Sequence, residues 1–142
     1  MDVDNDRPDL YITIGSKQWL IDVTIRHPLA PSHVEAVARN HMACIEAAEK
    51  EKHGIYKDLV ANTGITLVPF VVETTGRLGT EAKKFLNKEL IAEAASYRVV
   101  WAPKQVVYSI YREITMAVVK GNAAMFASNA RKCQLALARG LM

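Results

Sequence analysis

Hydrophobic residues near the start of the chain form two short runs, residues 10–14 and 19–25, which are rich in β-branched and aromatic side chains. Gly15, Ser16 and Lys17 lie between these runs and are typical of a tight turn. Two extended runs joined by so short a polar link predict a β-hairpin.

A third apolar run, residues 65–72, has hydrophobic side chains at both odd and even positions, so we expect a strand that is covered on both faces. Pro69 lies inside this run. Because proline cannot donate a hydrogen bond to a neighbouring strand, Pro69 favours a sheet edge or a bulge.

Longer stretches carry apolar residues at the spacing of a helix. One predicted helix covers residues 33–61, between the hairpin and the third strand, and a second covers residues 81–97. The chain from Pro103 onward is also predicted to be helical, with a break near Gly121 and Asn122.

The order of hairpin, helix, strand and helices indicates an α/β (α+β) fold, with helices that flank a small mixed β-sheet and a helical C-terminus. The third strand follows a helical crossover, which favours parallel pairing with a strand of the hairpin. A chain of 142 residues is long enough for one domain with its own core.

Composition narrows the cellular setting. No apolar run reaches the roughly 18 residues of a membrane span, and the acidic start, MDVDNDRPD, is unlike a signal peptide. We therefore expect a nuclear or cytoplasmic protein that is not secreted and has no membrane partner.

Cys44 and Cys133 form no CxxC pair, which predicts buried free thiols. The net charge of +3 is compatible with a polyanionic partner without requiring one.

Two aspartates interrupt the apolar pattern of the hairpin. Asp9 begins the first strand and Asp22 lies within the second, so that Asp9 would lie opposite positions 23–24 with Asp22 one diagonal step away. Adjacent carboxylates repel and raise each other's pKa, and a divalent cation such as Mg²⁺ removes this problem. The alternative is that both carboxylates are solvated at strand ends or pair with Arg7 and Arg26.

The hairpin also carries a motif. The segments RPDL, at residues 7–10, and DVTIRHP, at residues 22–28, are separated by about a dozen residues. This pattern resembles the restriction-like endonuclease domain of non-LTR retrotransposons, a branch of the PD-(D/E)XK nuclease superfamily. In that family a helix lysine replaces the usual lysine two places after the second acid. Here Thr24 stands at that place, and Lys52 precedes Tyr56 by four residues.

Two later segments extend the resemblance to about residue 130. VPFVVETTGRLGTEAKKFLNKEL is similar to the family's strand, Glu-Thr, glycine loop and helix, and REITMAVVKGNAAMF is similar to its Gly-Asn-Ala segment. The family's second lysine, directly before the tyrosine, is replaced by Ile55. The resemblance implies a restriction-endonuclease-like sheet and a metal-dependent endonuclease that hydrolyses phosphodiester bonds in DNA.

The resemblance also implies a set of site residues. The catalytic residues would be Asp9, Asp22, Lys52 and Tyr56. The ligands of Mg²⁺, or of Mn²⁺ as a substitute, would be Asp9, Asp22 and the backbone carbonyl of Val23. Lys52 would contact the scissile phosphate or orient water, and Tyr56 would contact a phosphate, although Lys52 as a solvated lysine and Tyr56 as a core residue are the alternatives.

Other polar residues near these segments have simpler interpretations. Glu49 lies one helical turn before Lys52 and is a candidate third acid, but a surface salt bridge is favoured. Glu73 matches the family's Glu-Thr and either touches the site or terminates the strand. His27 and His53 lack the spacing of a zinc site, and we expect neither to bind metal.

We divide the chain into an acidic tail (1–6), a nuclease-like core (7–100) and a C-terminal helical extension (101–142). Family members usually have a helix and a strand before the hairpin, so we expect an uncovered strand edge and a homodimer, through that edge or through the C-terminal helices. Two other functions stay open: a catalytically impaired relic that binds nucleic acid or self-associates, and an unrelated α/β interaction domain.

Overall fold

The computed structural model describes residues 7–96 and 103–139. Its three strands form one mixed sheet in the order β1–β2–β3, with β1 at Leu10–Ile14, β2 at Lys17–Arg26 and β3 at Thr66–Glu73. Strand β1 is antiparallel to β2, and β3 is parallel to β2, as the hairpin and the crossover predict. The α+β class is therefore confirmed.

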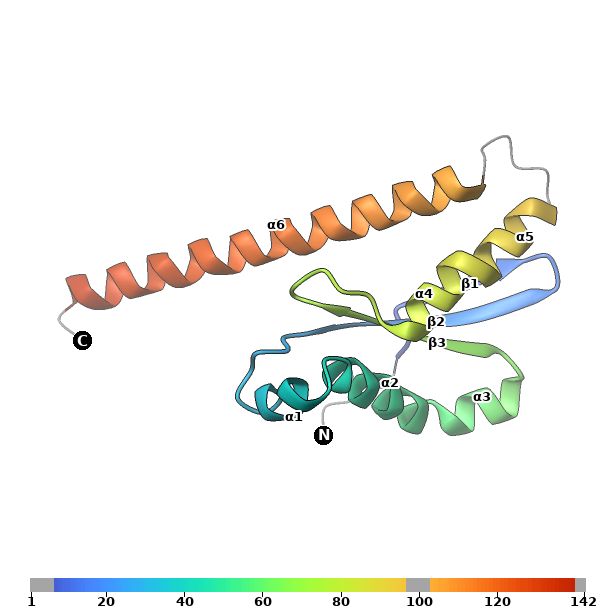
Figure 1. The fold of residues 1–142 in the computed structure, drawn as a ribbon, viewed down its shortest axis with the longest axis horizontal. Coiled ribbons are helices and arrows are strands. Elements are labelled where there is room, and N and C mark those ends of the chain that lie inside the picture. Colours follow the sequence, from blue (N-terminus) through green and yellow to red (C-terminus); the bar gives the residue numbers. More distant parts are fainter. Residues whose placement is uncertain (1–6, 97–102, 140–142) are drawn as a thin grey trace.

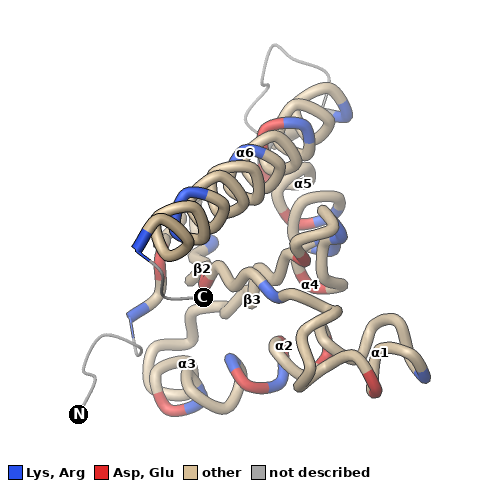
Figure 2. The backbone as a smooth tube through the Cα atoms, turned by 90° about the vertical axis from the view of Figure 1, so that its left-hand side faces the viewer, with Lys and Arg blue, Asp and Glu red and all other residues tan. Residues whose placement is uncertain are grey.

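Helices cover both faces of the sheet (Figures 1 and 2). The helices between β2 and β3 pack on one face: α1 at Val34–Arg39, α2 at Ala43–Ile55 and α3 at Lys57–Thr63. The elements after β3 pack on the other: α4 at Thr80–Lys84, the π-helical segment η1 at Phe85–Leu90, α5 at Ile91–Ser96 and α6 at Pro103–Ala138.

Side-chain alternation along β2 divides the core into two layers. Trp19 and Ile21 point toward η1 and α6 and belong to the largest buried cluster. Leu20 points toward the α2–α3 side, where it packs with Tyr56 and Leu67. Asp22 follows this alternation and is therefore directed toward α2, inside the protein.

Pro69 lies at an edge of the sheet, because β3 has no strand on its outer side among the described residues. The carbonyl of Val71 accepts a hydrogen bond from Gly79 N on that outer side, and Pro69 faces the same way two residues earlier. The missing proline N–H therefore interrupts no bond to β2, which confirms the edge position predicted from the sequence.

The prediction of one helix over residues 33–61 is wrong, because this segment forms three helices. Asn40 leaves the helical conformation at the end of α1, and its side chain accepts a hydrogen bond from Met42 N. Tyr56 separates α2 from α3 and is drawn into the core. Gly64, with φ of 67°, ends α3 in the left-handed region.

The predicted break near Gly121 and Asn122 is also wrong, because α6 runs without interruption for 36 residues. One interior glycine costs a helix only about 1 kcal/mol, and alanine and other good helix formers surround it. Much of α6 projects beyond the sheet (Figure 1).

The helix predicted over residues 81–97 is present to Ser96 as α4, η1 and α5. Residue 97, the tail 1–6 and the boundary at 100–101 lie outside the described residues.

Candidate active site

Asp22 is the centre of a polar cluster on the α2 face of the sheet. Its side chain is nearly inaccessible, with the residue 3% exposed. Oδ2 lies 3.0 Å from Nζ of Lys52 and accepts a hydrogen bond from the Thr24 hydroxyl, and Oδ1 accepts one from the Tyr56 hydroxyl at 2.7 Å. The sequence-based alternative of a solvated Asp22, or of its pairing with Arg26, is therefore wrong.

Lys52 and Tyr56 reach Asp22 because they are one helical turn apart. Lys52 lies in the last turn of α2 and Tyr56 directly follows that helix. The Lys52 side chain is 12% exposed, so it is largely but not completely buried. Tyr56 is a core residue, as the alternative interpretation expects, and its hydroxyl donates a hydrogen bond to the Asp22 carboxylate.

Asp9 bonds to the backbone of β2 on either side of Asp22. Its N–H donates to the Ile21 carbonyl at 3.0 Å, and its Oδ2 accepts from Val23 N at 2.7 Å. The β1–β2 register ends with Leu10 opposite Ile21, and Asp9, the residue before β1, bonds through its backbone to Ile21. The predicted backbone pairing of Asp9 with positions 23–24 is therefore wrong, although the Asp9 carboxylate does reach the backbone of Val23.

The oxygen atoms at this end of the hairpin suit a hard cation such as Mg²⁺, which takes one or two carboxylates and otherwise water and phosphate. The candidate donors are Asp9, Asp22 and the carbonyl of Val23, which faces the same edge as the Val23 N–H bonded to Asp9. Among the described residues, no group of three or more His, Cys, Asp or Glu side chains is arranged to hold a metal. Lys52 supplies a counter-charge to the Asp22 carboxylate.

Glu49 is not part of a surface salt bridge, contrary to the sequence-based expectation. It is 8% exposed, and its Oε1 accepts a hydrogen bond from Glu81 N in the first turn of α4. Burial is the main cause that raises the pKa of Glu49 above its ordinary value of 4.5. A Cβ atom at Gly79 would lie 2.6 Å from Glu49 Oε1, so this capping carboxylate depends on the glycine next to it.

Glu73 forms a second polar cluster at the end of β3, opposite Arg26 in the register of β2 and β3. It is buried, accepts a hydrogen bond from the Thr75 hydroxyl and lies 3.7 Å from Arg77 Nε. Arg26 pairs with Glu51. Among the described residues, Glu73 Oε1 and Arg26 Nε are buried with no hydrogen-bond partner. Sequence reasoning missed that Glu73 and Arg26 lie opposite each other on neighbouring strands, which only the strand register reveals.

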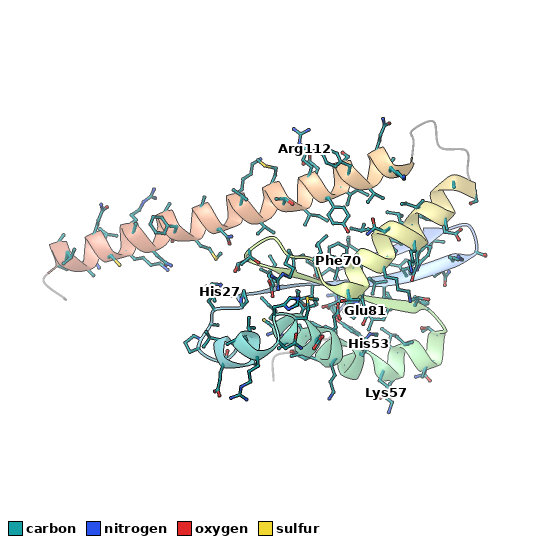
Figure 3. All side chains as sticks on the ribbon, viewed as in Figure 1. His27, His53, Lys57, Phe70, Glu81 and Arg112 are labelled. Carbon is teal, nitrogen blue, oxygen red and sulfur yellow. The ribbon has the colours of Figure 1, made fainter. Side chains whose placement is uncertain are left out.

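The two histidines considered in the sequence join neighbouring elements. His53 Nε2 lies 2.7 Å from Glu81 Oε1 and links α2 to α4 (Figure 3). His27 Nδ1 lies 2.8 Å from the Thr74 hydroxyl. Of the two cysteines, Cys44 is buried as predicted, whereas Cys133 on α6 is exposed, which corrects the expectation of two buried thiols.

A cavity of about 460 Å³ lies on the other face of the sheet, between the strands and α6. Its lining is almost wholly aliphatic and aromatic, and it includes Ile21, Phe70, Phe85 and Ile114. Such a surface offers neither charge nor ligand atoms to a phosphate group. The candidate chemistry is therefore on the α2 face, in the cluster of Asp22.

No family model, curated protein or solved structure matches this chain. The described helices include none that is both long enough and apolar enough to cross a membrane.

Proposed function

We propose that this protein is a metal-dependent DNA endonuclease domain of retroelement origin, which hydrolyses phosphodiester bonds. The observation that supports the proposal is the contact of Lys52 and Tyr56 with the buried carboxylate of Asp22, with Asp9 held against the next backbone amide. Lys52 and Tyr56 contact Asp22 although they lie 30 and 34 positions away in the chain, and Asp9 bonds to the β2 backbone next to Asp22. A cluster of this composition matches the site that the sequence resemblance implies.

In this proposal Mg²⁺ would be held by Asp9, Asp22 and the Val23 carbonyl. The bound cation supplies charge compensation at the phosphate and lowers the pKa of a bound water. Lys52 would bind a phosphate oxygen or orient that water, which is supported by its ammonium lying next to Asp22 and by the 12% exposure of its side chain. Tyr56 acts as a positioning residue, since its hydroxyl fixes the orientation of the Asp22 carboxylate.

The test is nicking of supercoiled plasmid by the purified protein. We expect open-circular product with Mg²⁺ or Mn²⁺ and none with a chelator. Absence of nicking under both metals would reject the endonuclease. A metal-dependent rise in melting temperature that is lost in Asp22→Asn would show that the same residues bind the cation, because a ligand of the native state stabilises it by mass action.

One observation favours a second candidate, a catalytically impaired relic that binds nucleic acid or self-associates. Lys52 already compensates Asp22, so the pair is a stable structural feature without any metal. In this case the protein binds duplex DNA with an affinity that falls as salt rises, and it does not nick. Under either candidate function we propose a nuclear or cytoplasmic protein that forms a homodimer and has DNA as its partner.

A further inference from the structure

The outer half of α6 presents an apolar stripe that the rest of the described chain does not cover. Its residues alternate at spacings of four and three, as in a coiled-coil heptad. The stripe, called here the α6 seam, consists of Val119, Ala123, Phe126, Ala130, Cys133 and Leu137. All six residues are exposed, and Phe126 is 78% and Leu137 62% accessible.

The α6 seam points away from the surface that attaches α6 to the sheet. The attachment uses Val107 and Val118, with Ile110 and Ile114 packed beside them. Successive residues of an α-helix are about 100° apart, which places the centre of the seam roughly 135° around the helix from the centre of these residues. The projecting part of the helix (Figure 1) is therefore open along the whole seam.

Charge along α6 leaves the seam free of ionic groups. After Glu113 the helix contains basic residues and no acidic ones, and lysine and arginine recur along it (Figure 2). In heptad positions counted from Ala130 as a, Arg131 and Lys132 lie at b and c, outside the seam. The e and g positions of the heptad flank the seam, and among them only Lys120 carries a charge. Basic residues therefore do not prevent two copies of the seam from meeting.

We propose that the α6 seam binds the α6 seam of a second copy of this chain, antiparallel, about a two-fold axis at the level of Ser128. In this register Val119 lies opposite Leu137 of the second copy, Ala123 opposite Cys133, and Phe126 opposite Ala130. Each layer joins an a position to a d position, as antiparallel pairing of heptads requires. The largest side chain meets one of the smallest, whereas parallel pairing places Phe126 on Phe126 and Ala130 on Ala130 and packs poorly.

The register also keeps the two sheets apart. Val118, the last α6 residue of the buried core, would lie level with residue 138 of the second copy. The two copies of Val118 are then about 30 Å apart along the helices, at 1.5 Å for each residue. Each body therefore sits at its own end of the helix pair.

The test is a disulfide between Ala123→Cys and the native Cys133, which this register places opposite each other. Under oxidised glutathione we expect a covalent dimer on a non-reducing gel that dithiothreitol dissociates. The matched control, Ala124→Cys, lies on the next position around the helix and should remain mostly monomeric on the gel. Cross-linking of the wild type through Cys133 alone would indicate parallel pairing and overturn the proposal, because Cys133 and its copy are about 15 Å apart along the antiparallel helices.

Sedimentation gives a second, independent measurement. We expect the wild type to be a dimer at high micromolar concentration, Phe126→Glu to be a monomer with unchanged helical circular dichroism, and Arg131→Glu, on the outer face, to remain a dimer. A monomeric wild type, or seam-dependent binding to lipid vesicles in place of dimerisation, would overturn the proposal. These measurements use neither DNA nor metal, so their outcome is separate from that of the endonuclease proposal.

Discussion

The Lys52 ammonium lies 3.0 Å from Oδ2 of Asp22, and both side chains are almost withdrawn from solvent. An isolated carboxylate inside a protein is strongly unfavourable, whereas a carboxylate with a cation and two hydroxyl donors is tolerated. The contact therefore explains how β2 retains an aspartate between apolar residues. It also places a cation at the position where the proposed chemistry needs one.

Replacement of Lys52 by methionine should destabilise the protein. The side-chain volume is nearly kept, but Asp22 stays buried without its cation, which typically costs about 3–5 kcal/mol. Urea unfolding at neutral pH measures this loss. The double variant Asp22→Asn/Lys52→Met should recover most of it.

Lys50→Met is the matched control, because Lys50 is on the same helix and exposed. It should change the free energy of unfolding by less than about 0.5 kcal/mol. A Lys52→Met variant that is as stable as the Lys50→Met variant would show that the Asp22–Lys52 pair does not form in solution.

The Tyr56 hydroxyl gives a separate prediction. Tyr56→Phe keeps the ring in the core and removes the donor to Asp22 Oδ1, and a hydrogen bond to a charged group contributes about 1.5–3 kcal/mol. Thermal or urea unfolding should show a loss of this order. Tyr11→Phe, at a position that is 54% exposed, should show almost none. Equal stability of the two variants would contradict the Tyr56–Asp22 hydrogen bond.

The raised pKa of Glu49 predicts that the free energy of unfolding depends on pH. Its pKa is raised in the folded protein, so the folded state holds this proton more tightly than the unfolded chain. The resulting stability is fully present below pH 4.5, the ordinary value, and is lost as the pH rises through the folded pKa. Glu49→Gln does not titrate and can still accept from Glu81 N. The stability of Glu49→Gln relative to the wild type should therefore increase between pH 4.5 and neutral pH, and a constant difference would contradict the account.

Alanine substitutions at two glycines should have opposite effects on stability, because Gly121 lies inside a helix and Gly64 lies at the end of one. Gly121 lies within α6 with open space around it, so Gly121→Ala should stabilise the protein by up to about 1 kcal/mol. Gly64 has φ of 67°, so Gly64→Ala should destabilise it by about 1 kcal/mol or more. Melting temperatures compare the two directly. Destabilisation by Gly121→Ala would indicate that α6 is interrupted there.

The strands and the contacts of Asp22 with Lys52 and Tyr56 were the predictable parts of this chain. Period-two patterns, the turn at Gly15 and the proline at position 69 indicate the sheet and its order, because strand pairing follows local alternation and turn chemistry. The convergence of Asp22, Lys52 and Tyr56 follows from the motif and from the four-residue spacing on a helix. Tertiary packing decides the helix boundaries and which acidic residues are buried.

Helix boundaries and buried acids could not be derived from local sequence. Asn40 divides the long predicted helix because its side chain bonds to the backbone N–H of Met42, and Tyr56 divides it because its ring is buried and its hydroxyl bonds to Asp22 on β2. Glu49 looks like a surface residue between Lys50 and Ala48, and only the packing of α4 against α2 reveals it as a buried cap. Gly121 shows the converse: a residue that weakens a helix does not end it when its neighbours favour the helix.

The most direct test of the endonuclease proposal separates catalysis from DNA binding. The nicking rate of supercoiled plasmid in Mg²⁺ and the affinity for the same DNA in Ca²⁺ are measured for the wild type, Asp22→Asn and Asp58→Asn, which changes an exposed aspartate on α3. The account predicts that Asp22→Asn, although less stable because Lys52 loses its partner, still folds and binds DNA but loses nicking, while Asp58→Asn nicks like the wild type. Nicking by purified Asp22→Asn at the wild-type rate would contradict it.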